Sequence, residues 1–192
     1  MKFKKIEKIH QGAFIARYDV TYETKEGHEK VYEMISRRKD LATEEDLRGG
    51  GADAVVMAIF DKSGDRILLN CEYRMSVADW VYNFPAGLID PGENFLEAAR
   101  RELKEETGLY LICVDDVLAE SYSAVGFSNE KNIFLVGTAE GEFEESDSEF
   151  EEIRQGWYTR HEVAELLKTA HFAGRTQSFC YLWSRKGLVE DL

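Results

Sequence analysis

Three glutamates stand close together in one charged stretch of the sequence, at 102, 105 and 106. On a helix, residues four apart lie about 40° apart around the axis, so Glu102 and Glu106 share one side and Glu105 lies further round. Two like charges at this spacing weaken a helix by roughly 0.2–0.5 kcal/mol, so the cluster needs a partner. A hard divalent cation such as Mg²⁺ binds few carboxylates together with substrate phosphates. The spacing therefore indicates a metal site, although glutamate-rich helices are commonly just solvated faces.

The segment that must carry these glutamates is expected to be a helix over residues 94–107. Asn94 predicts its N-cap, and Glu97 completes a capping-box pair three residues later. Gly108 predicts the C-terminal stop. Arg101 has a glutamate four residues away on either side, so we expect it to hold the surface of the helix in order. The apolar stripe consists of Leu96, Ala99 and Leu103.

Strand-like runs flank this helix on both sides, and two further helices follow. The expected strands are 52–60 and 66–73, which form a hairpin around a turn at 61–65, and 109–118, 132–139 and 155–158. Thr159 opens one later helix through a pair with Glu162. The last helix is expected over 176–186 and should bury Phe179, Leu182 and Trp183. This order predicts an α/β or α+β sandwich with a mixed sheet between helical layers.

The N-terminal part is expected to be a separate strand-rich segment. Strand-like runs at 13–22 and 30–36 are separated by a turn, and a polar stretch at 37–51 that ends in three glycines reads as a linker. We therefore place a domain boundary after residue 50, with residues 1–50 as N-terminal strands and 51–192 as the main domain.

The bulk properties exclude several classes of protein. The chain has 192 residues, 44% of them hydrophobic, and a net charge of −13, which argues against a general nucleic-acid binder. There is no apolar run of 18 residues and no secretory signal, so we expect no membrane partner and a cytoplasmic location. The cysteines are expected to be small buried hydrophobes in a reducing compartment, and the histidines to lie at the surface. These residues are Cys71, Cys113 and Cys180, and His10, His28, His161 and His171.

The stretch from residue 87 to residue 109 resembles the signature of the Nudix hydrolases at nine fixed positions. The matching residues are Gly87, Glu93, Arg101, Glu102, Leu103, Glu105, Glu106, Gly108 and Leu109. A pattern of this length in a turn-and-helix context is far more specific than a charge cluster. The resemblance implies an α/β/α sandwich with a mixed sheet, and it favours the branch that hydrolyses ADP-ribose and other nucleoside diphosphate sugars.

The resemblance also implies a divalent metal cofactor, Mg²⁺ with Mn²⁺ as a substitute. Glu102 and Glu106 match the principal ligands, with Glu105 as a third candidate in the catalytic set, and the carbonyl of Ala86 matches a common additional ligand. Glu93 matches the acid that orders the loop through the arginine of the signature, here Arg101.

In this branch a carboxylate on a loop well after the signature helix activates the attacking water. The corresponding stretch, from residue 140 to residue 152, contains eight acids and no base. Glu151 is the first candidate for this base and Glu149 the second, because both precede a local Ile153-Arg154 pattern that resembles the family's.

Two further segments resemble the nucleoside diphosphate sugar branch and imply substrate contacts. Arg74 matches an arginine that contacts the diphosphate. The segment from 123 to 130 matches a loop of this branch and contributes Gly126, Phe127 and Glu130. The ADP-ribose enzymes usually have proline and glutamate where this chain has Val125 and Asn83, which leaves room for another nucleoside diphosphate sugar.

The N-terminal strands resemble an extra antiparallel sheet through which this branch forms homodimers, often with exchanged strands. Phe14, Tyr18 and Tyr22 are candidates to stack on the base of the substrate. Two alternatives to the leading function stay open: hydrolysis of another nucleoside diphosphate, such as a damaged nucleotide or a coenzyme, and a sensor that binds its ligand without catalysis.

Overall fold

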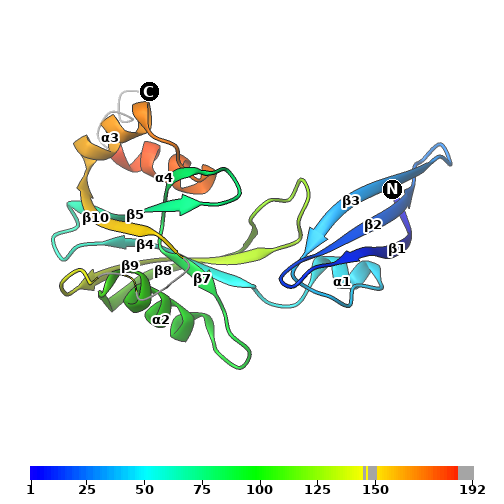
Figure 1. The fold of residues 1–192 in the computed structure, drawn as a ribbon, viewed down its shortest axis with the longest axis horizontal. Coiled ribbons are helices and arrows are strands. Elements are labelled where there is room, and N and C mark those ends of the chain that lie inside the picture. Colours follow the sequence, from blue (N-terminus) through cyan, green and yellow to red (C-terminus); the bar gives the residue numbers. More distant parts are fainter. Residues whose placement is uncertain (145, 147–150, 186–192) are drawn as a thin grey trace. The chain divides into compact units, whose positions relative to one another are not determined.

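The computed structural model describes residues 1–144, 146 and 151–185, and the chain forms two compact units (Figure 1). Unit 1 comprises Met1–Asp53 and Glu120–Asn132, and unit 2 comprises Ala54–Ala119 and Ile133–Leu192. Unit 1 thus includes a segment, Glu120–Asn132, that lies beyond the boundary placed after residue 50.

Unit 1 is built on a small antiparallel sheet in the order β1-β2-β3. Its elements are β1 (Lys2–Gln11), β2 (Ala16–Glu23), β3 (Glu29–Ser36) and the short helix α1 (Glu44–Arg48). The predicted strands correspond to β2 and β3, whereas β1 and α1 were not predicted. Tyr18 is fully buried in the core of this unit, and its hydroxyl donates to the carbonyl of Arg38. The prediction that Tyr18 could stack on a substrate base is therefore wrong.

Unit 2 contains a seven-stranded sheet whose main path is β10-β5-β4-β9-β8, with β6 paired to β5 and β7 paired to β4. The strands are β4 (Ala54–Phe60), β5 (Arg66–Arg74), β6 (Asp79–Asn83), β7 (Ala86–Leu88), β8 (Tyr110–Tyr122), β9 (Lys131–Glu140) and β10 (Ile153–Thr159). The predicted hairpin and the three later strands are confirmed. Helices cover both faces of the sheet (Figure 1), which confirms the predicted sandwich with a mixed sheet.

Helix α2 (Phe95–Thr107) covers one face, and helices α3 (Arg160–Thr169) and α4 (Gly174–Ser184) cover the other. The two faces of β5 explain this division, because successive side chains of a strand point in opposite directions. Leu68 packs with Leu103 of α2, and Leu69 packs with Val163 of α3. Leu182 of α4 is 64% exposed, so its predicted burial is wrong.

The ends of α2 are as the sequence predicted. Asn94 accepts hydrogen bonds from the backbone of Leu96 and Glu97, and the Glu97 carboxylate accepts one from the backbone of Asn94. Gly108 ends the helix in the left-handed conformation. These bonds satisfy backbone donors that a helix otherwise leaves free at its first turn.

The cysteines and histidines only partly follow the sequence predictions. Cys180 is buried and Cys71 is half-buried, but Cys113 is exposed, so the prediction that all three are buried is wrong for Cys113. All three are free thiols. The four histidines are exposed, as predicted. No helix in the described part of the chain is long and apolar enough to cross a membrane.

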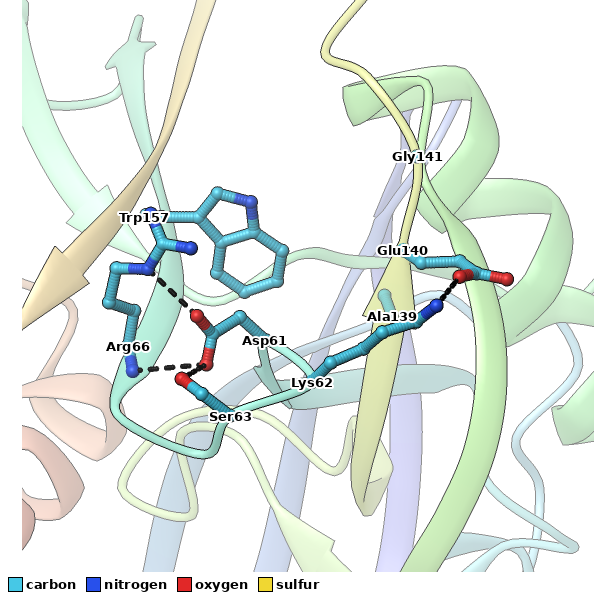
Figure 2. Close-up of a pocket in the computed structure, with 8 residues that line it drawn as sticks. All are labelled: Asp61, Lys62, Ser63, Arg66, Ala139, Glu140, Gly141 and Trp157. Atoms are coloured by element: carbon cyan, nitrogen blue, oxygen red, sulfur yellow. Dashed lines mark hydrogen bonds and ion pairs between the residues drawn. The ribbon is translucent and has the colours of Figure 1, made fainter.

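The turn between β4 and β5 is held by Asp61. Its carboxylate accepts hydrogen bonds from Ser63 Oγ at 2.8 Å and Arg66 Nε at 2.8 Å (Figure 2). A surface hollow of about 370 Å³ lies beside this turn, and Trp157 and an ion pair between Lys62 and Glu140 line it. Arg66 begins β5, so this hollow is at the opposite end of the strand from Glu72 and Arg74.

Candidate active site

The site begins on β5, where alternation puts Asn70, Glu72 and Arg74 on the face that carries α2. Asn70 is fully buried and Glu72 nearly so. Arg74 Nη1 donates to Glu72 Oε2 at 2.9 Å. Buried polar groups require hydrogen-bond partners, and α2 supplies some of them.

Glu106 of α2 meets this face of β5. It is 7% exposed, and its Oε2 accepts a hydrogen bond from Asn70 Nδ2 at 2.9 Å. Burial raises the pKa of Glu106 well above its usual range, and the negative charges of Glu72, Glu102 and Glu151 raise it further. A carboxylate in such surroundings is poorly stabilised in its charged form unless a cation joins it.

Glu102 lies one helical turn before Glu106 and is packed against the backbone of β7. A Cβ atom added to Gly87 would lie 1.8 Å from the Glu102 carboxyl carbon, so no other residue fits at position 87 without displacing Glu102. Burial raises the pKa of Glu102, an effect that Arg101 opposes. The glycine of the signature thus leaves the space that the Glu102 carboxylate occupies.

Arg101 connects the loop before α2 to the glutamates on it. Its Nε and Nη2 donate to the two oxygens of Glu93 at 3.0 and 2.8 Å, and Nη2 also donates to the carbonyl of Leu88 at 3.0 Å. Its Nη1 donates to Glu102 at 2.8 Å and Glu105 at 3.2 Å. The Glu105 contact matches the expected spacing of four residues. The expected contact with the glutamate four residues before Arg101 is wrong, because that glutamate caps the helix.

The chain returns to this site just before β10. Ile153 pairs with Glu72 in the antiparallel ladder, and Tyr73 donates its backbone N–H to the carbonyl of Glu152 at 3.0 Å. Glu151 is exposed, and its charge contributes to raising the pKa values of Glu72, Glu102 and Glu106. Glu151 therefore lies near enough to Glu72, Glu102 and Glu106 for its charge to affect all three carboxyl groups. Glu149, the second candidate for the base, lies outside the described residues.

Two residues of this cluster were not predicted as site residues from the sequence. Asn70 and Glu72 approach Glu106 from a strand more than 30 residues earlier in the chain, and the signature does not extend to them. Two polar residues inside an otherwise apolar strand were the available signal, because fully buried strand positions are normally apolar. Arg175, at the start of α4, was also missed, and its positive charge lowers the pKa of Glu72 against the effect of burial.

The predicted substrate loop belongs to unit 1. There Tyr32 donates its hydroxyl to the carbonyl of Gly126, and Arg37 forms an ion pair with Glu130. Phe127 is 56% exposed. Within unit 1 these bonds connect β3 to the loop, and the role of the loop in substrate binding stays a prediction.

The cluster offers the oxygen donors that a hard divalent cation takes. Within the described residues no three acidic, histidine or cysteine side chains are arranged closely enough to hold an ion as they stand. Two of the carboxylates are turned toward arginines instead, Glu102 toward Arg101 and Glu72 toward Arg74. The all-oxygen donor set, the raised pKa values and the glycine that accommodates Glu102 nonetheless fit such a cation.

Comparison with known proteins places this geometry in a family. The NUDIX domain model matches residues 51–178, and the chain belongs to the Nudix family. A crystal structure of an ADP compounds hydrolase superposes with a TM-score of 0.68 at 24% identity and covers 98% of this chain and 96% of that chain. The two proteins share the fold.

Three relatives differ in the share of their length that matches. ADP compounds hydrolase NudE of Escherichia coli is 29% identical over 168 residues, which cover 87% of this chain and 82% of that protein. An 8-oxo-dGDP phosphatase of Mus musculus is 36% identical over 130 residues, which cover 66% of this chain and 39% of that protein. The ADP-ribose pyrophosphatase of Saccharomyces cerevisiae is 41% identical over 76 residues, which cover 38% of this chain and 33% of that protein. The match thus spans two fifths or less of the latter two proteins.

Proposed function

We propose that this chain hydrolyses the pyrophosphate bond of ADP-ribose or a related nucleoside diphosphate sugar and gives a nucleoside monophosphate and a sugar phosphate. For ADP-ribose the products are AMP and ribose 5-phosphate. The observation that carries the proposal is a cluster of three carboxylates, those of the buried Glu72 and Glu106 and the half-buried Glu102. Their pKa values are raised on the face of the sheet that holds the Nudix helix. The similarity to an ADP compounds hydrolase and an ADP-ribose pyrophosphatase supports this substrate class.

We propose Mg²⁺ as the cofactor, with Mn²⁺ as a substitute. Glu102, Glu106 and Glu72, together with the carbonyl of Ala86, would hold it. When bound, such an ion neutralises phosphate charge and acidifies a coordinated water. Glu105 stays a candidate of the catalytic set. It is exposed and paired with Arg101, which supports a secondary role.

Glu151 is proposed to accept the proton of the attacking water on a carboxylate oxygen. The oxygen of that water bonds to one phosphorus, and the bridging oxygen leaves with the other phosphate group, so the pyrophosphate bond breaks. The exposure of Glu151 and its electrostatic influence on the buried glutamates support this role. Glu149 remains the second candidate for this base.

Arg74 and Arg175 are proposed to bind the oxygens of the diphosphate. Both interact with Glu72, Arg74 through a direct ion pair and Arg175 through its charge. An arginine offers several donors to a phosphate group and retains its charge at every relevant pH. Gly126, Phe127 and Glu130 remain proposed substrate contacts on the sequence resemblance alone.

A second candidate substrate is a nucleoside diphosphate that carries no sugar on its terminal phosphate. The similarity to 8-oxo-dGDP phosphatases of Mus musculus and Homo sapiens, at 36% and 32% identity, favours it. The same carboxylates would serve either substrate, because both contain a pyrophosphate bond.

A substrate panel tests the proposal. The purified chain with Mg²⁺ is incubated with ADP-ribose, GDP-mannose, UDP-glucose, 8-oxo-dGDP and dinucleotides, and the products are separated by chromatography. We expect the fastest turnover with a nucleoside diphosphate sugar. Glu106→Gln should lower the rate by orders of magnitude while the chain stays folded. A lack of turnover of every compound would favour the sensor interpretation.

A further inference from the structure

Asn70 is a fully buried amide in the middle of β5 and follows Leu68 and Leu69, which belong to the two hydrophobic cores of unit 2. Its Nδ2 donates to Glu106 Oε2 at 2.9 Å. Its Oδ1 is buried and has no hydrogen-bond partner among the described residues. Buried polar atoms are nearly always paired, so the unpaired oxygen requires an explanation.

The orientation of the amide follows from its neighbour. With Glu106 ionised, as a bound cation requires, a flipped Asn70 side chain would place its oxygen against a carboxylate oxygen of Glu106, and neither atom could donate. The unpaired Oδ1 is therefore the consequence of presenting Nδ2 to Glu106. The residue keeps one unsatisfied acceptor and provides one donor to a carboxylate.

This donor differs from those that hold the neighbouring carboxylates. Glu102 and Glu72 are held by arginines, which partly neutralise them. Glu106 is held by the neutral amide of Asn70 and by the backbone of Ala86. A neutral donor fixes the direction of a carboxylate and leaves its negative charge available to a cation.

We propose that Asn70 is a positioning residue that orients the Glu106 carboxylate, with its charge intact, toward a bound divalent cation. The proposal rests on the proposed function in that the site takes such a cation. Asn70 acts through Glu106 and has no contact of its own with the substrate. Residues that orient a metal ligand in this way typically alter metal affinity about 10- to 100-fold when they are replaced.

The experiment measures Mn²⁺ binding to the purified full chain by electron paramagnetic resonance, without substrate. Asn70→Leu replaces the amide oxygen and nitrogen by methyl groups on the same branched outline, and we expect about 10- to 100-fold weaker Mn²⁺ binding. Leu69→Val is the matched control, because Leu69 is equally buried on the same strand but faces the opposite side of the sheet. It should bind Mn²⁺ as the unmodified chain does, even if its melting temperature falls. Equal Mn²⁺ affinity in Asn70→Leu and the unmodified chain would overturn the proposal.

A double-mutant cycle separates positioning from general destabilisation. In a Glu106→Gln background, Asn70→Leu should cause less than a twofold further loss of Mn²⁺ affinity, because the group that Asn70 orients is already gone. If Asn70→Leu weakens Mn²⁺ binding by the same factor in the Glu106→Gln background as in the unmodified chain, Asn70 acts independently of Glu106 and the proposal is wrong.

A measurement on the unmodified chain covers the case in which Asn70→Leu does not fold. The side-chain amide resonance of Asn70 should shift when saturating Mg²⁺ is added, while that of Asn132, a buried amide of unit 1, should not. An unchanged Asn70 resonance would contradict the proposal. Because these readouts require no turnover, a chain whose Mn²⁺ affinity depends on Asn70 and Glu106 but that hydrolyses no substrate would contradict the proposed function alone.

Discussion

Glu151 and Glu152 are adjacent acids in front of β10, but the structure gives them different surroundings. The backbone carbonyl of Glu152 accepts a hydrogen bond from the backbone of Tyr73, while the charge of Glu151 raises the pKa values of Glu72, Glu102 and Glu106. Two neighbouring glutamates in an acidic run are alike in the sequence, and only the return of the chain to β5 separates them. We therefore expect them to differ in catalysis.

Glu151→Gln should lower kcat by roughly 10²- to 10⁴-fold, the usual contribution of a general base, and should leave KM nearly unchanged. Glu152→Gln is the matched control and should change kcat less than about threefold, because its side chain is exposed and its backbone bond is retained. Steady-state kinetics with the best substrate of the panel provides both values. Similar, mild losses in both variants would mean that no single glutamate of this pair is the base.

The buried glutamates should also make the metal-free chain sensitive to pH. Burial raises the pKa of Glu106 above its usual value of 4.5, so the folded chain holds this proton more tightly than the unfolded chain. The resulting stabilisation is complete below about pH 4.5 and is lost as the pH rises through the raised pKa. In the presence of a chelator, the free energy of unfolding should therefore fall as the pH is raised above 4.5.

Urea unfolding of the unmodified chain and of Glu106→Gln at several pH values measures this effect. The variant has no carboxyl group at 106, so its free energy of unfolding should fall less over the same pH range. Parallel curves for the two chains would contradict the assignment of the raised pKa to Glu106.

At the scale of elements, α2 could be predicted to the residue because its signals are local. Asn94, Glu97 and Gly108 are capping residues within one short stretch, and the structure uses each of them as expected. The short helix α1 has the same kind of signal, a capping box between Thr43 and Asp46, and the polar composition of its segment hid it.

Two other features could not be predicted because they depend on distant parts of the chain. Strand β1 is mostly exposed and lies at the edge of its sheet beside β2, so it lacks the alternation of a half-buried strand. The bond between Asn70 and Glu106 joins residues 36 positions apart and requires the packing of α2 on β5. The site residues on α2 could thus be predicted from the sequence, whereas Asn70 and Glu72 on β5 could not.

The cap of α2 should affect both stability and catalysis. Asn94→Ala removes the bonds to the first turn and should lower the free energy of unfolding by about 1 kcal/mol. It should also lower kcat/KM, because Glu93, which holds Arg101, immediately precedes the cap. Thr159→Ala removes the equivalent cap of α3 and should cause a similar loss of stability without a change in kcat/KM. Denaturant unfolding and steady-state kinetics on both variants test this. Equal changes in kcat/KM in the two variants would contradict the prediction.

At the scale of the whole molecule, we propose that the chain forms a homodimer through unit 1. Large apolar side chains are exposed in unit 1, among them Phe14 in the connection between β1 and β2, at 81%, and Val31 in β3, at 57%. Exposed apolar surface of this kind commonly marks an interaction site. A second copy of the chain is the occupant that the sequence resemblance indicates.

Light scattering after size-exclusion chromatography tests the dimer. The unmodified chain should have twice the monomer mass, and the double variant Phe14→Ser, Val31→Ser should shift toward the monomer. Leu182→Ser, which removes an apolar side chain of intermediate exposure (64%, between Val31 and Phe14) from α4 in unit 2, should leave the mass unchanged. A monomeric unmodified chain would rule out the dimer.

Strand β5 has two chemically distinct faces, one that carries Asn70, Glu72 and Arg74, and one that carries Leu69, Cys71 and Tyr73. Since side chains alternate strictly, an insertion or deletion of one residue within this strand would exchange the two sets. It would turn the amide and the carboxylate into the apolar layer under α3 and α4 and present a thiol and a phenol to the Nudix helix. The site therefore depends on the number of residues within this strand as well as on their identity.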